Sequence, residues 1–304
     1  MSGGTSGRLA QYVPGDLVDG RRRERLRRAW LRLTSSSLSL VGLVVVAVVI
    51  LSAVFAPTIA PYPEDAGDSL NFDRQSQSPS LDHPMGTDTL GRDILSRVLF
   101  GARISVMMGF VVLSIAIGIG VPLGLIAGYL GGWPNVLVMR TTDVFLSIPP
   151  ILLALVVTAA LEPNLWNAMI AIAFAWWPWY TRLIQGEVLS VKEEEFVEAS
   201  ESLGAGWFRT TFREILPNVI APLTVKATLD FGFVILTGAA LAFLGLGARP
   251  PTPSWGAMIA QGRGNVTNFW WIATMPGLAI SFTVLGFNLL GDGLRDIFDV
   301  DVQQ

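Results

Sequence analysis

Long apolar segments separated by shorter polar ones constrain the fold of this chain more than any other feature. Six segments are long enough to cross about 30 Å of hydrocarbon as helices. They span residues 38–60, 103–130, 136–160, 165–188, 218–245 and 270–291. A segment inside a membrane must satisfy its own backbone hydrogen bonds. The sequence therefore predicts an all-α, polytopic membrane protein with six transmembrane helices, and its 51% hydrophobic content agrees.

The charges that flank these segments predict their orientation. A basic block from Arg21 to Arg28 precedes the first apolar segment, so we expect residues 1–37 to form a cytoplasmic tail. Residues 38–60 have spanning length and should form an uncleaved first transmembrane helix. Residues 61–102 should form an extracytoplasmic loop, and residues 103–304 a core domain with five further helices. Six crossings place both termini in the cytoplasm.

The end of the predicted loop has a helical pattern of its own. Apolar residues recur at helical spacing from Thr89 to Arg103, which predicts a separate short helix along the membrane surface. In the next segment, small residues leave one helix face bare, which favours close helix packing in a membrane. These residues are Gly118, Gly120, Gly124 and Gly128.

A polar segment, residues 190–218, lies between two apolar ones. Its pattern predicts a helix, a glycine break at Gly204 and Gly206, and a second short helix that ends at Pro217. The first helix has a face of small residues, and Trp207 and Phe208 begin an aromatic face on the second. Such an amphipathic projection in a membrane protein indicates a surface that binds a partner.

This projection resembles the "EAA" loop of ABC-importer permeases. The resemblance lies in Glu-Ala-Ser-x-x-Leu-Gly-Ala-Gly at 198–206, followed by a phenylalanine and Leu-Pro-Asn. In that family the loop is a coupling helix that sits in a groove on a cytoplasmic ATPase. The resemblance implies a role in ATPase coupling for Glu198, Ala199, Ser200, Leu203, Gly204, Ala205, Phe212, Leu216 and Pro217.

Further motifs are similar to those of C-type permeases of dipeptide, oligopeptide and nickel importers. They lie at 83–103, 243–247, 250–256 and 288–296. The resemblance implies the type I importer permease fold, a second B-type permease subunit, one or two ATPase subunits and an extracytoplasmic solute-binding protein. It also implies alternating access as the mechanism. Members of this group transport dipeptides, oligopeptides, glutathione, nickel chelates or sugars.

The sequence argues against catalysis in this chain. It has no Walker A motif, because neither Lys192 nor Lys226 follows a glycine-rich loop. It has no cysteine and a single histidine, His83, in a polar loop, so we expect no metal site and no cofactor. A net charge of −3 argues against nucleic acid as a partner.

Two other classes of membrane protein fit this sequence less well. An ion-coupled secondary transporter would call for several membrane carboxylates and inverted repeats, but Asp230 is the only deep carboxylate and no repeat is visible. A structural membrane protein would not need the amphipathic projection. Many family members carry a carboxylate in the fifth span where this chain has Thr237 to Ala240, so a substrate-facing charge has moved to Asp230 or been lost.

Ionisable residues inside the spans mark candidate functional positions. Lys226 and Asp230 lie one helical turn apart, and a pore-lining role and a structural ion pair are equally compatible with that spacing. Aromatic residues around Pro178, including Trp177 and Tyr180, predict either helix packing or the lining of a pore. For two other groups, Asp143 beside Arg140 and Arg182 near Glu187, interfacial anchoring is the favoured interpretation.

Overall fold

The computed structural model describes residues 36–301, and these residues are almost entirely helical. Extended pairing in this range is limited to an isolated bridge between Thr87 and Asp93. The all-α prediction is therefore confirmed for the described part of the chain. The predicted basic block, Arg21 to Arg28, lies outside it.

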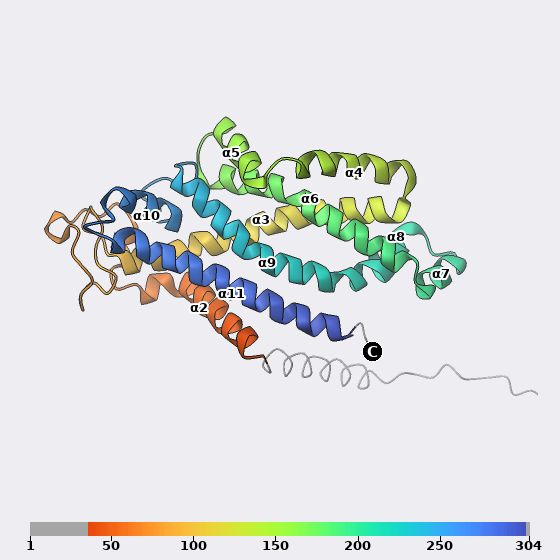
Figure 1. Cartoon of the computed structure of the whole chain (residues 1–304), viewed down its shortest axis with the longest axis horizontal. Coiled ribbons are helices and arrows are strands. Elements are labelled where there is room, and N and C mark those ends of the chain that lie inside the picture. The colour runs from red at the N-terminus through yellow and green to blue at the C-terminus, as the bar shows by residue number, and fades with distance from the viewer. Residues whose placement is uncertain (1–35, 302–304) are drawn as a thin grey trace, which may run out of the picture.

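Long helices run side by side along the bundle (Figure 1). They are α2 (Ser37–Ile59), α3 (Ile94–Leu130), α6 (Leu165–Lys192), α9 (Leu216–Phe243) and α11 (Trp271–Asp301). Two shorter helices, α4 (Gly132–Leu146) and α5 (Pro150–Ala160), contact α6. One end of the bundle carries a polar cap, which we define as residues 60–93, together with α10 (Trp255–Gly262). The other end carries α7 (Glu195–Ser202), α8 (Trp207–Arg209) and the C-terminal end of α11. The shorter helical elements are η1 (Pro63–Ala66), η2 (Phe72–Arg74), the π-helical η3 (Thr210–Ile215) and η4 (Arg263–Asn265).

The expected count of six spans is only partly confirmed. In the described residues, four helices are long and apolar enough to cross a membrane, or five if α4 and α5 count as one bent span. Helix α6 is 28 residues long but is not among them. Residues such as Asn167, Thr181 and Arg182 lower its mean hydropathy, and nearly half of the helix is buried among its neighbours. Within a membrane, polar side chains are tolerated where they face the interior of the bundle and not lipid.

Two expected boundaries are wrong. The predicted surface helix from Thr89 to Arg103 is not separate, because α3 is continuous from Ile94 to Leu130. Asp93 caps it by accepting a hydrogen bond from the Ser96 N–H. The predicted third span is broken, since α4 and α5 meet at 86°. Pro149 has no N–H to donate and disfavours helical backbone in the preceding residue, which ends α4.

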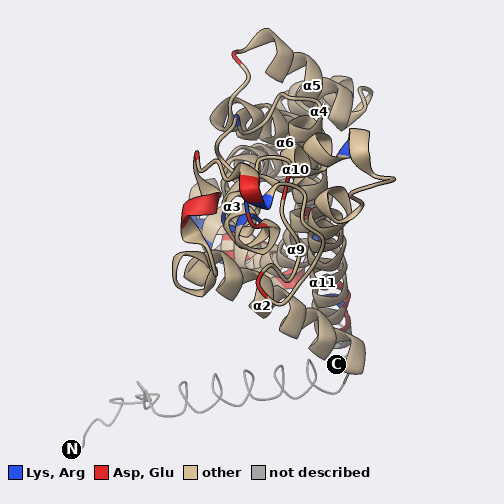
Figure 2. Cartoon of the chain, turned by 90° about the vertical axis from the view of Figure 1, so that its left-hand side faces the viewer, with Lys and Arg blue, Asp and Glu red and all other residues tan. Residues whose placement is uncertain are grey.

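The polar cap closes one end of the bundle with buried charges, and Figure 2 shows acidic and basic residues gathered there. Asp93 is fully buried and accepts a hydrogen bond from His83 Nδ1 at 2.9 Å. Arg92 pairs with Asp88 at 2.8 Å. Arg97 donates to the Asp65 carbonyl at 3.1 Å. His83 lies in a polar loop, as the sequence predicts, but it is buried there and hydrogen-bonded to Asp93.

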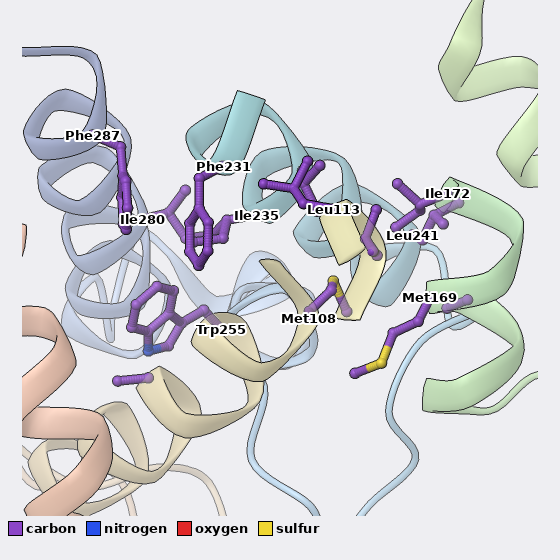
Figure 3. Packing of buried hydrophobic residues seen from close by; sticks show 14 of the residues in the cluster. Met108, Leu113, Met169, Ile172, Phe231, Ile235, Leu241, Trp255, Ile280 and Phe287 are labelled. Carbon is purple, nitrogen blue, oxygen red and sulfur yellow. The ribbon is translucent and has the colours of Figure 1, made fainter. Parts of the chain in front are cut away.

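The apolar core runs along the middle of the bundle and joins α3, α6, α9, α10 and α11 (Figure 3). Phe231 of α9 stacks on Phe287 of α11 with ring centroids 4.2 Å apart. Trp255 of α10 is buried and donates its Nε1–H to the Val98 carbonyl of α3 at 2.9 Å. These contacts tie α9 to α11 and α10 to the start of α3.

Helices α3 and α6 share the largest contact between described elements. Three glycines of α3 allow this approach, because a Cβ atom at any of them would lie 2.6–2.7 Å from an atom of α6. Gly120 faces Tyr180, Gly124 faces Ile184, and Gly128 faces Val188. Gly118 does not take part, since nothing lies within 4 Å of its Cβ position. The prediction of a bare helix face is confirmed for the other three glycines.

We therefore expect Gly124→Ala to lower the thermal unfolding midpoint of the detergent-solubilised protein. The added methyl group would meet Ile184 and the Thr181 carbonyl, and overpacking costs about 1–3 kcal/mol. The matched control is Gly118→Ala on the same helix, which should leave the midpoint unchanged or slightly raised because alanine favours helix. Equal midpoints for the two variants would contradict the packing role of Gly124.

Candidate functional site

The projection between α6 and α9 is built around one left-handed residue. Gly204 has φ of +82° and follows Leu203, the C-cap residue of α7. Its N–H donates to the Glu201 carbonyl at 2.8 Å, and the Ala205 N–H donates to the Ser200 carbonyl at 3.1 Å. These two bonds form a Schellman motif, in which glycine is favoured because it has no Cβ. Gly206 has φ of −72°, so the expected glycine break depends on Gly204 alone.

The second helix of the projection does not end at Pro217, contrary to the sequence prediction. Residues Trp207–Phe243 form a continuous helix of 37 residues. The segment just before Pro217 is π-helical, and the Leu216 N–H donates to the Thr211 carbonyl five residues earlier. The wider turn makes room for the proline ring, which would otherwise clash with the carbonyl four residues back. The projection is therefore joined to α9 without a loop.

Buried residues anchor the projection to the ends of α3 and α6. Val197 of α7 and Ile215 of η3 are at most 1% exposed and pack in a cluster with α3 and α6. The Tyr129 hydroxyl donates to Glu201 Oε1 at 2.8 Å, and Lys192 Nζ donates to the Tyr129 carbonyl at 2.8 Å. Sequence reasoning missed these anchors, because they are brought together from distant parts of the chain.

The outer side of the projection presents what we term the aromatic surface: Leu203, Trp207, Phe208 and Phe212. Leu203 is 89% exposed and Phe208 is 62% exposed. The ring of Phe208 lies 5.7 Å from that of Trp207 and 4.5 Å from that of Phe212. Exposed apolar groups at this density are typical of an interaction site.

The predicted coupling residues all lie on or beside this surface. Glu198, Ala199, Leu203, Gly204, Phe212 and Pro217 are exposed, and Ser200, Ala205 and Leu216 are half-buried. Their docking role stays a prediction. Sequence reasoning assigned no such role to Trp207 and Phe208, although their aromatic pattern was visible.

A second group of polar residues lies midway along the bundle. Lys226 Nζ lies 2.6 Å from Asp230 Oδ1, so the ion pair that their spacing allows is formed. The Asp230 side chain is 6% exposed and that of Lys226 is 32% exposed. The second carboxylate oxygen of Asp230 is buried without a hydrogen bond, and the buried Tyr180 hydroxyl of α6 faces the same carboxylate.

The aromatic residues around Pro178 lie in two different environments, one buried and one exposed. Tyr180 is fully buried, and Trp177 is 6% exposed with its ring 5.3 Å from that of Phe145. Trp179 is exposed, and Lys226 Nζ lies 5.6 Å from its ring centroid. Within this chain, Trp177 and Tyr180 therefore pack between helices, and Trp179 provides the outer aromatic contact.

A further ion pair connects α6 to α4. Arg182 pairs with Asp143, and both side chains are exposed. The sequence grouped each with a neighbour along its own helix, Arg140 and Glu187, and the structure corrects that grouping. Trp179 and Arg182 are three residues apart on α6, so they share a face. We term Lys226, Asp230, Trp179, Arg182 and Asp143 the charged face.

The described residues contain no group of three or more histidine, cysteine, aspartate or glutamate side chains placed to hold a metal ion. The buried charges of the polar cap are instead matched by arginine, histidine and backbone N–H groups. The arrangement can therefore hold the cap rigid.

Two family models match the chain. Residues 120–304 match the family described as binding-protein-dependent transport system inner membrane component. The chain belongs to this family. Residues 24–79 match the N-terminal TM domain of oligopeptide transport permease C. The expected membership of the ABC-importer permeases, C-type subunit, is confirmed.

Individual relatives agree with this assignment. The chain is 45% identical over 275 residues to the dipeptide transport system permease protein DppC of Alkalihalophilus pseudofirmus, which covers 90% of this chain and 89% of that protein. It is 42% identical over 267 residues to the probable D,D-dipeptide transport system permease protein DdpC of Escherichia coli, with 88% and 89% covered. It is 43% identical over 274 residues to a glutathione transport system permease protein GsiD of E. coli, with 90% of each covered.

A solved structure supports the permease fold. The chain resembles a chain of the MetNI methionine ABC transporter in an inward-facing conformation, with a TM-score of 0.55 and 20% sequence identity. The match covers 67% of this chain and 95% of that chain. At this identity the likeness shows the fold alone.

The Lys226–Asp230 pair predicts non-additive effects on stability. Asp230→Asn should lower folded yield more than the double variant Lys226→Gln/Asp230→Asn, because a single change strands a charge and the double change leaves neutral groups. A double-mutant cycle should give a coupling energy of about 1 kcal/mol or more. Additive effects on the thermal unfolding midpoint would show that the pair does not stabilise the fold.

Proposed function

We propose that this chain forms half of the translocation pathway of an ATP-driven importer of dipeptides. The observation that carries the proposal is the aromatic surface, an exposed apolar patch anchored to the ends of two long helices. A patch so placed suits the transfer of movement from a partner into the bundle. The dipeptide substrate is supported by the 45% and 42% identical permeases, which are named for dipeptide transport.

In this proposal the chain itself is non-catalytic, and partner subunits hydrolyse ATP. The aromatic surface and the predicted coupling residues dock on an ATPase. Because Trp207–Phe243 is one continuous helix, a displacement of the docked end moves α9 directly. That motion would alternate the access of a path formed with a second, B-type permease subunit. An extracytoplasmic solute-binding protein would deliver the substrate.

The proposed orientation in the cell membrane follows from the same assignment. The aromatic surface faces the cytoplasm with both termini, and the polar cap faces the extracytoplasmic side. The charged face lies along the path. Lys226 reaches its surface, Asp230 supports it, and Trp177 and Tyr180 form the packed layer behind.

Uptake measurements test this function. Vesicles that contain the chain with its partner permease, ATPases and binding protein should accumulate a labelled dipeptide only when ATP is supplied. Uptake of glutathione in place of dipeptides would reassign the substrate, as the relationship to a glutathione permease allows. Uptake driven by an ion gradient without ATP would exclude the importer mechanism.

The docking assignment predicts the effect of a charge on the aromatic surface. Leu203→Asp should reduce copurification of the ATPase, since loss of a central apolar contact costs about 2 kcal/mol. Gly204→Pro should do the same, because proline cannot adopt the left-handed conformation. The matched control is Leu81→Asp, an equally drastic change at a fully exposed leucine in the polar cap. Wild-type ATPase yield with both Leu203→Asp and Gly204→Pro would falsify the docking role.

The orientation predicts opposite labelling of two single cysteines. The chain has no native cysteine, so Ser78→Cys and Ser202→Cys each introduce a unique thiol. Both positions are exposed and lie at opposite ends of the bundle. A membrane-impermeant thiol reagent added to intact cells should label the cysteine at position 78 and spare the one at 202. The reverse pattern would invert the topology.

A further inference from the structure

The charged face cannot be an ordinary lipid-facing surface. It carries two ion pairs, Lys226–Asp230 and Arg182–Asp143, and all of these residues except Asp143 lie well inside helices of the bundle. Lys226 and Asp230 lie about 15 Å and 21 Å along α9 from its first residue. Charges at such depth are costly against hydrocarbon, and they usually face water, a cavity or another polypeptide.

The two side chains of the Lys226–Asp230 pair differ in their exposure to the surface. One Asp230 oxygen accepts from Lys226, and the other is buried beneath the surface near Tyr180. The lysine side chain is 32% exposed, against 6% for the aspartate. An incoming molecule would therefore meet a hydrogen-bond donor with positive charge, and the acceptor behind it would be out of reach.

Lys226 retains capacity for a further partner. An ammonium group has three hydrogens to donate, and in the described part of the chain Asp230 is the only hydrogen-bond acceptor of Lys226. The group also lies over Trp179, whose exposed ring adds an apolar surface beside the charge. Asp230 holds the ammonium in position and reduces the cost of placing it there.

We propose that Lys226 binds the C-terminal carboxylate of the transported peptide during its passage, with Asp230 as the positioning residue. This inference rests on the proposed function. A dipeptide offers one amino group and one carboxylate, and only the carboxylate is an acceptor that matches the exposed donor. The peptide amino group would need an acceptor at this position, but one oxygen of Asp230 is buried and the other accepts from Lys226.

The experiment compares uptake of a dipeptide with a free C-terminus and its C-terminal amide, in vesicles with the complete transporter and its binding protein. The measured quantity is the ratio of the two uptake efficiencies. The same binding protein serves every variant, so its own selectivity is a common factor that cancels when ratios are compared. A charge-assisted hydrogen bond is worth about a tenfold or greater preference.

In the double variant Lys226→Gln/Asp230→Asn, the preference for the free carboxylate should fall about tenfold, and the double change avoids a stranded Asp230. Lys226→Arg should keep most of it, because the charge remains. The matched control is Arg140→Gln, which removes an exposed cation of α4 that lies outside the charged face and should leave the ratio unchanged.

A second measurement tests the same role if uptake of the peptide amide is too low to quantify. In Lys226→Cys, a thiol reagent that adds an aminoethyl group should restore dipeptide uptake, and one that adds a neutral methyl group should not. An unchanged ratio in the double variant, or equal rescue by both reagents, overturns the role of Lys226. Absence of ATP-dependent dipeptide uptake in the wild type would instead overturn the proposed function.

Discussion

The close contact between α3 and α6 is the constraint on which the other features depend. Gly120, Gly124 and Gly128 leave no side chain between the two helices, so the backbone of α3 lies directly against α6. Without a hydrophobic drive between helices in a membrane, such contact is a main source of packing energy. It fixes the end of α6, and the projection that follows α6 is therefore fixed as well.

The same contact links the two candidate functional surfaces. Val188 packs over Gly128 and also belongs to the cluster that holds Val197 and Ile215 of the projection. Tyr180 packs over Gly120 and faces Asp230. One helix interface thus supports the aromatic surface at one end and the charged face at the middle. The continuous helix from Trp207 to Phe243 runs past both, so the two surfaces are joined by a rigid element and by no loop.

Buried charged residues are paired differently in the polar cap and at the charged face. In the polar cap, Asp65, Asp88 and Asp93 are matched by arginine, histidine and backbone donors, and little of this network is exposed. Such satisfied networks make a loop rigid. At the charged face the acids are less evenly matched, and the Lys226 ammonium and the Arg182 guanidinium stay open to the surface. The first arrangement suits structure, and the second suits recognition.

The sequence by itself determined the helical class, the family and the position of the projection, because apolar length, glycine placement and the spacing of motifs are local properties. It also placed Lys226 and Asp230 within reach of each other, since residues four apart on a helix are neighbours, and it left open whether they form a pair or line a pore. Tertiary structure alone decided the partner of Arg182, the burial of His83 and the anchors of the projection, because these contacts join residues distant in the chain. It also decided that α3 is one helix and that Pro217 lies within another. Local helix propensity predicts that these two helices end or divide at those positions. Packing along their whole length, together with a π-helical turn before Pro217, outweighs that propensity.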